Sequence, residues 1–124
     1  MKHGKGRWVF GDGAFYDGEF VNGNIEGEGA YNYGNGKQYV GSFRNNLKEG
    51  LGKLVTGDGI TYEGNFSNNK INGTGTLMKE GENTYTGEFV NGQKHGVGIT
   101  TKPDGSKSRA RWENGSKVED LPME

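Results

Sequence analysis

The sequence has no cysteine and only two prolines among its 124 residues. Without cysteine it has no disulfide framework and no thiolate metal site, and we take this to favour a reducing compartment. No run of about 18 apolar residues is present, so we predict no membrane-spanning helix. The opening segment, MKHGKGRWVF, lacks the apolar core of a signal peptide. The net charge of −1 argues against general nucleic-acid binding, which depends on neutralising phosphates.

Glycine is abundant, and it is periodic. Hydrophobic residues make up only 29% of the chain and glycine numbers 25, a composition close to that of disordered proteins. However, 24 of the 25 glycines fall into columns that repeat every 23 residues. The aromatic residues keep the same spacing, in two columns: Tyr16, Tyr39, Tyr62, Tyr85 and Phe20, Phe43, Phe66, Phe89. Disordered linkers do not maintain a regular 23-residue spacing, so we predict stacked structural repeats.

Each period has the alternation of two strands. FYDGEFV (15–21) and GEGAYNY (27–33) both alternate with period two, and Asn-Gly and Asp-Gly pairs between such segments indicate tight hairpins. By this parity, 13 of the 14 aromatic residues share one face with the glycines, and Phe15 is the exception. A glycine then leaves a slot over which a neighbouring ring can lie. We predict an all-β fold, an elongated, twisted single-sheet ribbon of about five stacked antiparallel β-hairpins.

No catalytic constellation emerges from the sequence. His3 and His95 share one column four periods apart, and even neighbouring members should be roughly 9–10 Å from one another, too far for a shared metal ion. Asp12, Asp58 and Asp104 occupy turns, where short polar side chains are favoured. The glycine-rich loops lack the strand-loop-helix context and the Gly-Lys-Ser/Thr sequence of a phosphate-binding loop. We predict no catalytic, cofactor-binding or metal site.

Two surfaces are candidates for interaction. The first is an aromatic groove, which either packs as the core alone, the favoured interpretation, or stays partly open for a partner helix or extended peptide. The second is a basic edge, either a solvated edge strand guarded by charge or a weak site for an acidic partner or anionic lipid. The groove residues are Trp8, Tyr16, Phe20, Tyr31, Tyr39, Phe43, Tyr62, Phe66, Tyr85, Phe89 and Trp112; the basic edge is Lys102, Lys107, Arg109 and Arg111.

The two ends of the chain interrupt the repeat. The sequence opens on the second half of a unit and closes on the first half of one, giving five strand–turn–strand units from about 4–21 to 96–113. Both outer sheet edges should then be unpaired, and an unpaired edge invites a partner or a second copy. The polar segment 117–124 is expected to be a frayed tail, or to become ordered only against a partner.

The repeat unit resembles the MORN (membrane occupation and recognition nexus) repeat. The resemblance rests on YDGEFVNGNIEGEG, YEGNFSNNKINGTG and YTGEFVNGQKHGVG, which begin at Tyr16, Tyr62 and Tyr85; YVGSFRNNLKEGLG from Tyr39 fits with Asn46 in place of glycine. We expect a repeat domain over residues 1–116, with full repeats from 16, 39, 62 and 85 and partial repeats at 3–13 and 108–116. In the last, Ser108 and Ala110 replace tyrosine and glycine.

The resemblance implies a non-enzymatic scaffold that contacts other proteins of a structural complex. Proteins similar to this family use their repeats in cilia and flagella, including radial-spoke heads, at membrane junctions, and beside catalytic domains. The best single expectation is a cytoplasmic, cytoskeleton-associated protein of the ciliary or flagellar axoneme. The alternatives are a peripheral membrane or phosphoinositide-binding module, for which the basic surface predicts only weak membrane contact, and a regulatory segment of a larger enzyme.

Overall fold

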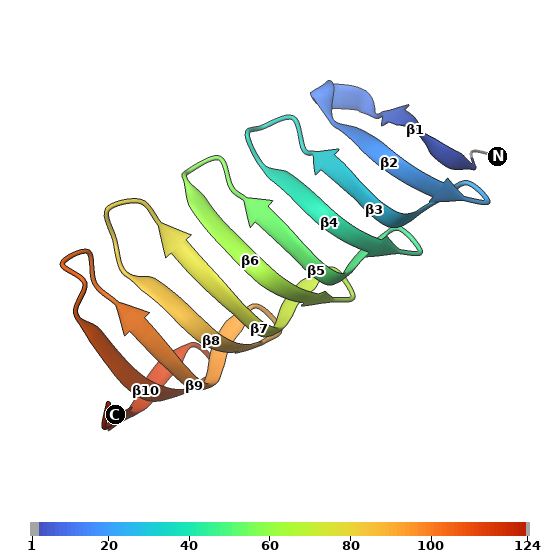
Figure 1. The fold of residues 1–124 in the computed structure, drawn as a ribbon. Coiled ribbons are helices and arrows are strands. Elements are labelled where there is room, and N and C mark those ends of the chain that lie inside the picture. Colours follow the sequence, from blue (N-terminus) through green and yellow to red (C-terminus); the bar gives the residue numbers. More distant parts are fainter. Residues whose placement is uncertain (1–2, 124) are drawn as a thin grey trace.

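The computed structural model describes residues 3–123, which form one open antiparallel sheet. Its 11 strands lie in sequence order, so each strand pairs with its neighbours along the chain. The sheet is elongated, and the two termini lie at its opposite ends (Figure 1). The all-β prediction of stacked hairpins is confirmed.

The elements have the following bounds: β1 (Gly4–Val9), η1 (Gly11–Gly13), β2 (Phe15–Val21), β3 (Asn24–Asn32), β4 (Gln38–Arg44), β5 (Leu47–Val55), β6 (Ile60–Ser67), β7 (Lys70–Lys79), β8 (Thr84–Val90), β9 (Gln93–Thr101), β10 (Lys107–Glu113) and β11 (Ser116–Leu121).

Tight two-residue turns close one side of the ladder. In the turn between β2 and β3, Asn22 has φ 51° and Gly23 has φ 81°. Both residues are thus left-handed, as in the type I′ turn that matches strand twist. Asparagine is among the few non-glycine residues that adopt this conformation readily, which explains why Asn45-Asn46 can form the next such turn.

A buried tyrosine over paired glycines is the repeating core unit. Gly64 of β6 lies opposite Gly75 of β7, and a Cβ atom added to Gly75 would lie 2.5 Å from the Tyr62 ring. The hydroxyl of Tyr62 donates a hydrogen bond to the backbone carbonyl of Asn65, at 2.9 Å. The ladder register shifts around Asn65, so a β-bulge presents this carbonyl to the ring. Tyr16, Tyr39 and Tyr85 repeat the hydrogen bond.

The rings of successive repeats form a continuous core. Tyr62 packs edge-on against Phe66 of its own strand, with centroids 5.3 Å apart, and against Phe89 of the next repeat at 5.2 Å. Such aromatic pairs stabilise by about 0.5–1.5 kcal/mol beyond their buried area. We call the side of the sheet that carries these rings the aromatic face. Phe15 lies on the opposite side of the sheet, where Arg7 covers its ring. Strand parity predicts this position for Phe15, the one aromatic residue outside the aromatic face.

The expectation of a frayed tail after residue 116 is wrong. Ser116–Leu121 forms β11, which pairs with β10. The Asn114-Gly115 turn closes this hairpin, and an Arg111–Glu119 ion pair holds its two strands together. The C-terminal sheet edge is therefore β11 and not β10.

Candidate interaction surface on the aromatic face

Most of the predicted groove residues are buried in the chain's own core. Eight of them have exposed fractions between 0% and 6%: Tyr16, Phe20, Tyr39, Phe43, Tyr62, Phe66, Tyr85 and Phe89. Trp8 is 42% exposed, and Tyr31 and Trp112 are half-buried. The buried rings fill the floor of the groove, so a partner on this face would contact its rim and its two ends.

The N-terminal end of the aromatic face carries a run of stacked rings. Trp8 stacks on Phe10 with centroids 5.1 Å apart, and Phe10 stacks on Tyr31 at 5.4 Å. Tyr31 in turn lies 4.6 Å from Tyr33. Lys37 places its ammonium 4.5 Å from the centre of the Tyr33 ring. This end therefore combines accessible aromatic surface with a positive charge.

Two lysines in the aromatic face were missed in the sequence. Lys48 is only 8% exposed, and its ammonium lies over the rings of Tyr33 and Tyr39, at 5.1 and 5.5 Å. Burial, with a smaller contribution from the charge of Lys37, lowers the pKa of Lys48 to about 8. Among residues 3–123, the one hydrogen-bond acceptor of its ammonium is the side-chain oxygen of Asn69, at 3.5 Å.

Lys94 occupies the same column two repeats later. Its ammonium lies 4.4 Å from the ring centre of Trp112 and 4.9 Å from that of Tyr85. Burial lowers its pKa below the ordinary lysine value. Ile71, between the two lysines in this column, and Ile25, one repeat before Lys48, are apolar. In the sequence, the signal for these two lysines was the alternation of isoleucine and lysine in this column, which places Lys48 and Lys94 46 residues apart.

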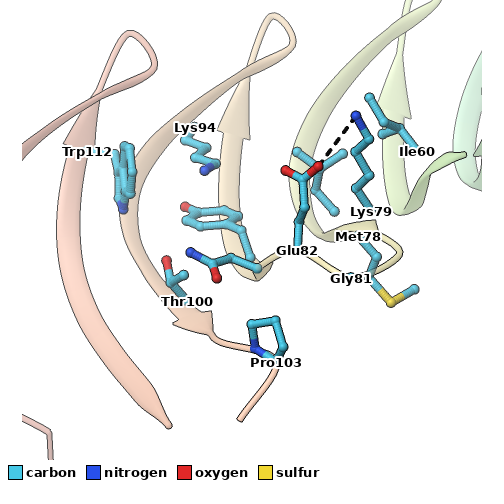
Figure 2. Close-up of a pocket in the computed structure, with 12 residues that line it drawn as sticks. Ile60, Met78, Lys79, Gly81, Glu82, Lys94, Thr100, Pro103 and Trp112 are labelled. Carbon is cyan, nitrogen blue, oxygen red and sulfur yellow. Dashed lines mark ion pairs between the residues drawn. The ribbon is translucent and has the colours of Figure 1, made fainter. Parts of the chain in front are cut away.

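Lys94 faces a groove of about 650 Å³ at the C-terminal end of the aromatic face. Figure 2 shows Lys94, Trp112, Thr100 and Pro103 around this space. At its far side the Lys79 ammonium pairs with the Glu82 carboxylate at 3.5 Å (Figure 2). At the rim of the groove, the charges of Lys79 and Glu82 therefore neutralise each other. At its wall, the Lys94 ammonium lies against the rings of Tyr85 and Trp112.

The predicted basic edge is not an edge. Its β10 members have a strand on each side, since β10 pairs with both β9 and β11. Arg111 is paired with Glu119, and Arg109 donates a hydrogen bond to the Pro122 carbonyl at 3.2 Å. Lys102 and Lys107 are exposed. Half of this cluster already has a partner within the chain, and binding of anions by the cluster stays a prediction.

The two histidines occupy turn-flanking positions. Nδ1 of His3 accepts a hydrogen bond from the backbone of Asn22, at 3.4 Å. Glu26 and Asn72, in the same column, accept from the corresponding Asn45 and Asn91. These three members of the column therefore cap hairpin turns of the next unit, whereas Nδ1 of His95 is buried with no hydrogen-bond partner in the described part of the chain. Within residues 3–123, no group of three or more potential metal-ligating side chains comes together.

Comparison with known proteins gives one family. The model of the MORN repeat matches residues 1–15, 16–38, 39–61, 62–80 and 85–107. No curated protein matches the chain. The MORN repeat is a non-catalytic module that mediates protein or membrane interactions. The described part of the chain contains no helix long and apolar enough to cross a membrane.

Proposed function

The chain belongs to the MORN-repeat family, and on that premise we propose that it is a non-enzymatic scaffold for protein–protein interaction in a cytoskeletal assembly. The axoneme of a cilium or flagellum, and its radial spokes, is the proposed location. That location is supported by the family resemblance, since similar proteins use these repeats in such assemblies.

The observation that carries the scaffold proposal is the single open sheet. All of its strands lie in one ladder along the length of the molecule (Figure 1), and the buried rings from Tyr16 to Phe89 form one continuous cluster on it. A surface of this form contacts an elongated partner at several successive repeats. The terminal strands β1 and β11 each pair on one side only, and an open edge is a site for strand pairing with another chain or a second copy.

The membrane alternative has less support from the charges. Anionic membranes attract basic surface with about 1 kcal/mol for each lysine or arginine near the surface. In the predicted basic edge, Arg111 is offset by Glu119; on the neighbouring strand β11, Lys117 is offset by Asp120 at 3.0 Å. The remaining charge is small, so we expect weak vesicle binding or none.

Affinity purification from native extract after mild crosslinking tests the proposal. We expect axonemal or other cytoskeletal proteins to co-purify in a stable proportion. Recovery of a single catalytic subunit would instead favour the role of a regulatory segment. Flotation with phosphatidylserine vesicles is the second measurement, comparing the double variant Arg109→Glu/Arg111→Glu with the double variant Lys53→Glu/Lys70→Glu, which changes the net charge equally at two exposed lysines. Vesicle binding that only the arginine pair abolishes would support the membrane role and contradict the scaffold proposal.

A further inference from the structure

The Lys94 ammonium has no charged or hydrogen-bonded partner among residues 3–123. Its only contacts of a polar kind are with the faces of Tyr85 and Trp112, and within residues 3–123 no carboxylate or carbonyl accepts a hydrogen bond from its ammonium. The nearby carboxylate of Glu82 is engaged by Lys79. An ammonium has three donors, and a partly desolvated charge without acceptors is costly. The arrangement is therefore incomplete as an intramolecular contact.

Ring packing explains why the lysine is held in place. The aliphatic stem of a lysine can cover apolar surface while its charge reaches water, and a cation over a ring gains about 0.5–2 kcal/mol. The two rings fix the ammonium beside the groove of about 650 Å³. Pro103 and Leu77 supply apolar lining around this space. A group that binds here would need a negative charge for Lys94 and an apolar part for the lining.

We propose that this groove binds an acidic segment of a partner protein, with an aspartate or glutamate carboxylate on the ammonium of Lys94. The inference rests on the proposed scaffold function and names the chemistry of one of its contacts. Trp112 and Tyr85 contact the apolar residues that flank the carboxylate, and they exclude water from the ion pair. Exclusion of water strengthens such a pair compared with an exposed one.

A protein side chain fits this site better than a membrane surface. The ammonium lies between two rings at the groove wall (Figure 2), where a flexible side chain can reach it. A flat anionic bilayer would first meet the exposed rim, where the Lys79–Glu82 ion pair leaves no net positive charge to attract it. The exposed apolar side chain at that rim is Met78, at 38%, with no cluster of rings to insert into lipid.

A second ammonium lies further along the same face. Lys48 is the second residue of β5 and Lys94 is the second residue of β9, so four strand spacings, about 19 Å, separate the two lysines. An extended segment covers that distance in roughly six residues. Lys37 lies beside Lys48 over the same ring, which makes this second position the more positive of the two. The partner segment should therefore carry a second acidic position, matched to Lys37, because Lys48 itself is buried.

The test is selection from a display library of random peptides on the immobilised full chain. We expect the selected peptides to be enriched in aspartate and glutamate beside apolar residues. Their affinity for Lys94→Met should fall by about tenfold or more, while the control Lys107→Met, an exposed lysine outside the groove, should bind as the wild type does. Replacing the acidic residues of a selected peptide by their amides should produce the same loss.

Several results would overturn the inference. These are selected peptides without acidic enrichment, equal affinity for wild type and Lys94→Met, and phosphatidylserine vesicles that bind through Lys94. Methionine keeps the stem that covers Tyr85, so folding should be unchanged; Lys94→Gln provides a second variant if the melting temperature of the first falls. Recovery of the native complex by Lys94→Met in full yield would reject this groove while leaving the scaffold proposal intact.

Discussion

Replacing Gly75 by alanine tests whether the tyrosine over the paired glycines holds the sheet together. The added Cβ would lie 2.5 Å from ring carbons of Tyr62, well inside van der Waals contact. The ring is 1% exposed and packs edge-on against Phe66 and Phe89, so it has no free space to enter. The backbone of Gly75 lies outside the left-handed region, so any loss comes from the ring and not from backbone strain.

The expected cost is about 2–4 kcal/mol in the free energy of unfolding. Overpacking a well-packed core costs roughly 1–3 kcal/mol. Displacement of the ring would also break the hydrogen bond from the Tyr62 hydroxyl to the Asn65 carbonyl, which contributes about 1 kcal/mol. Urea denaturation measures the change. The control is Gly11→Ala, at a glycine with ordinary φ whose Cβ would meet nothing within 4 Å, and its effect should stay within about 0.5 kcal/mol.

A double-mutant cycle with Tyr62→Ala isolates the contact. Removing the ring should itself cost about 3–5 kcal/mol, as for other large buried aromatics. In that background Gly75→Ala should cost little, or stabilise by roughly 0.5–1 kcal/mol, because alanine loses less backbone entropy than glycine. The coupling should be about 2 kcal/mol or more. Equal losses in both backgrounds would refute the explanation of why this column is glycine.

Three further outcomes follow from side chains in the same core. Lys48→Met should raise the free energy of unfolding near pH 7 by roughly 1–2 kcal/mol. The pKa of Lys48 falls from roughly 10.4 in the unfolded chain to about 8 in the folded protein, so the stability of the wild type should rise as the pH increases from about 8 to 10.4. Urea denaturation at several pH values should show this rise for the wild type and not for the variant. Tyr62→Phe should cost about 1 kcal/mol by loss of its hydrogen bond, measured against Tyr31→Phe, whose hydroxyl has no hydrogen bond within residues 3–123. Asn46→Gly should cost about 1 kcal/mol in thermal unfolding, because its side-chain oxygen accepts from the Ile25 amide at 2.8 Å.

The repeat, the strands and the aromatic face could be predicted because they depend on local rules. Alternation with period two places side chains on faces whatever the tertiary context, and Asn22-Gly23 selects a hairpin turn on its own backbone preferences. A 23-residue period then copies each inference along the chain. This is why the burial of Tyr16, and the different environment of Phe15 on the other face, follow from the sequence.

β11 and the buried lysines depended on contacts that the local pattern does not carry. Residues 117–124 have little apolar alternation, and their strand forms because β10 offers backbone partners and Arg111 offers an ion pair to Glu119. A lysine such as Lys48 ordinarily indicates solvent. Its burial follows from Tyr33, which belongs to the preceding unit and covers it. Such contacts between neighbouring units cannot be inferred from the sequence of a single repeat.

The departures from strict repetition have a consequence for how a partner is placed. A face that repeated identically would accept an elongated partner in several positions, each shifted by one unit. Along this face the column alternates Ile25, Lys48, Ile71 and Lys94. A one-unit shift toward the N-terminus would move a bound carboxylate from Lys94 onto Ile71, leaving the carboxylate partly desolvated and unpaired, which is strongly unfavourable. Specificity obtained by penalising the wrong arrangement is common in protein interfaces. The lysines would thereby fix the position of an acidic partner along the ladder, while the tyrosines and glycines, which do not vary, maintain the ladder itself.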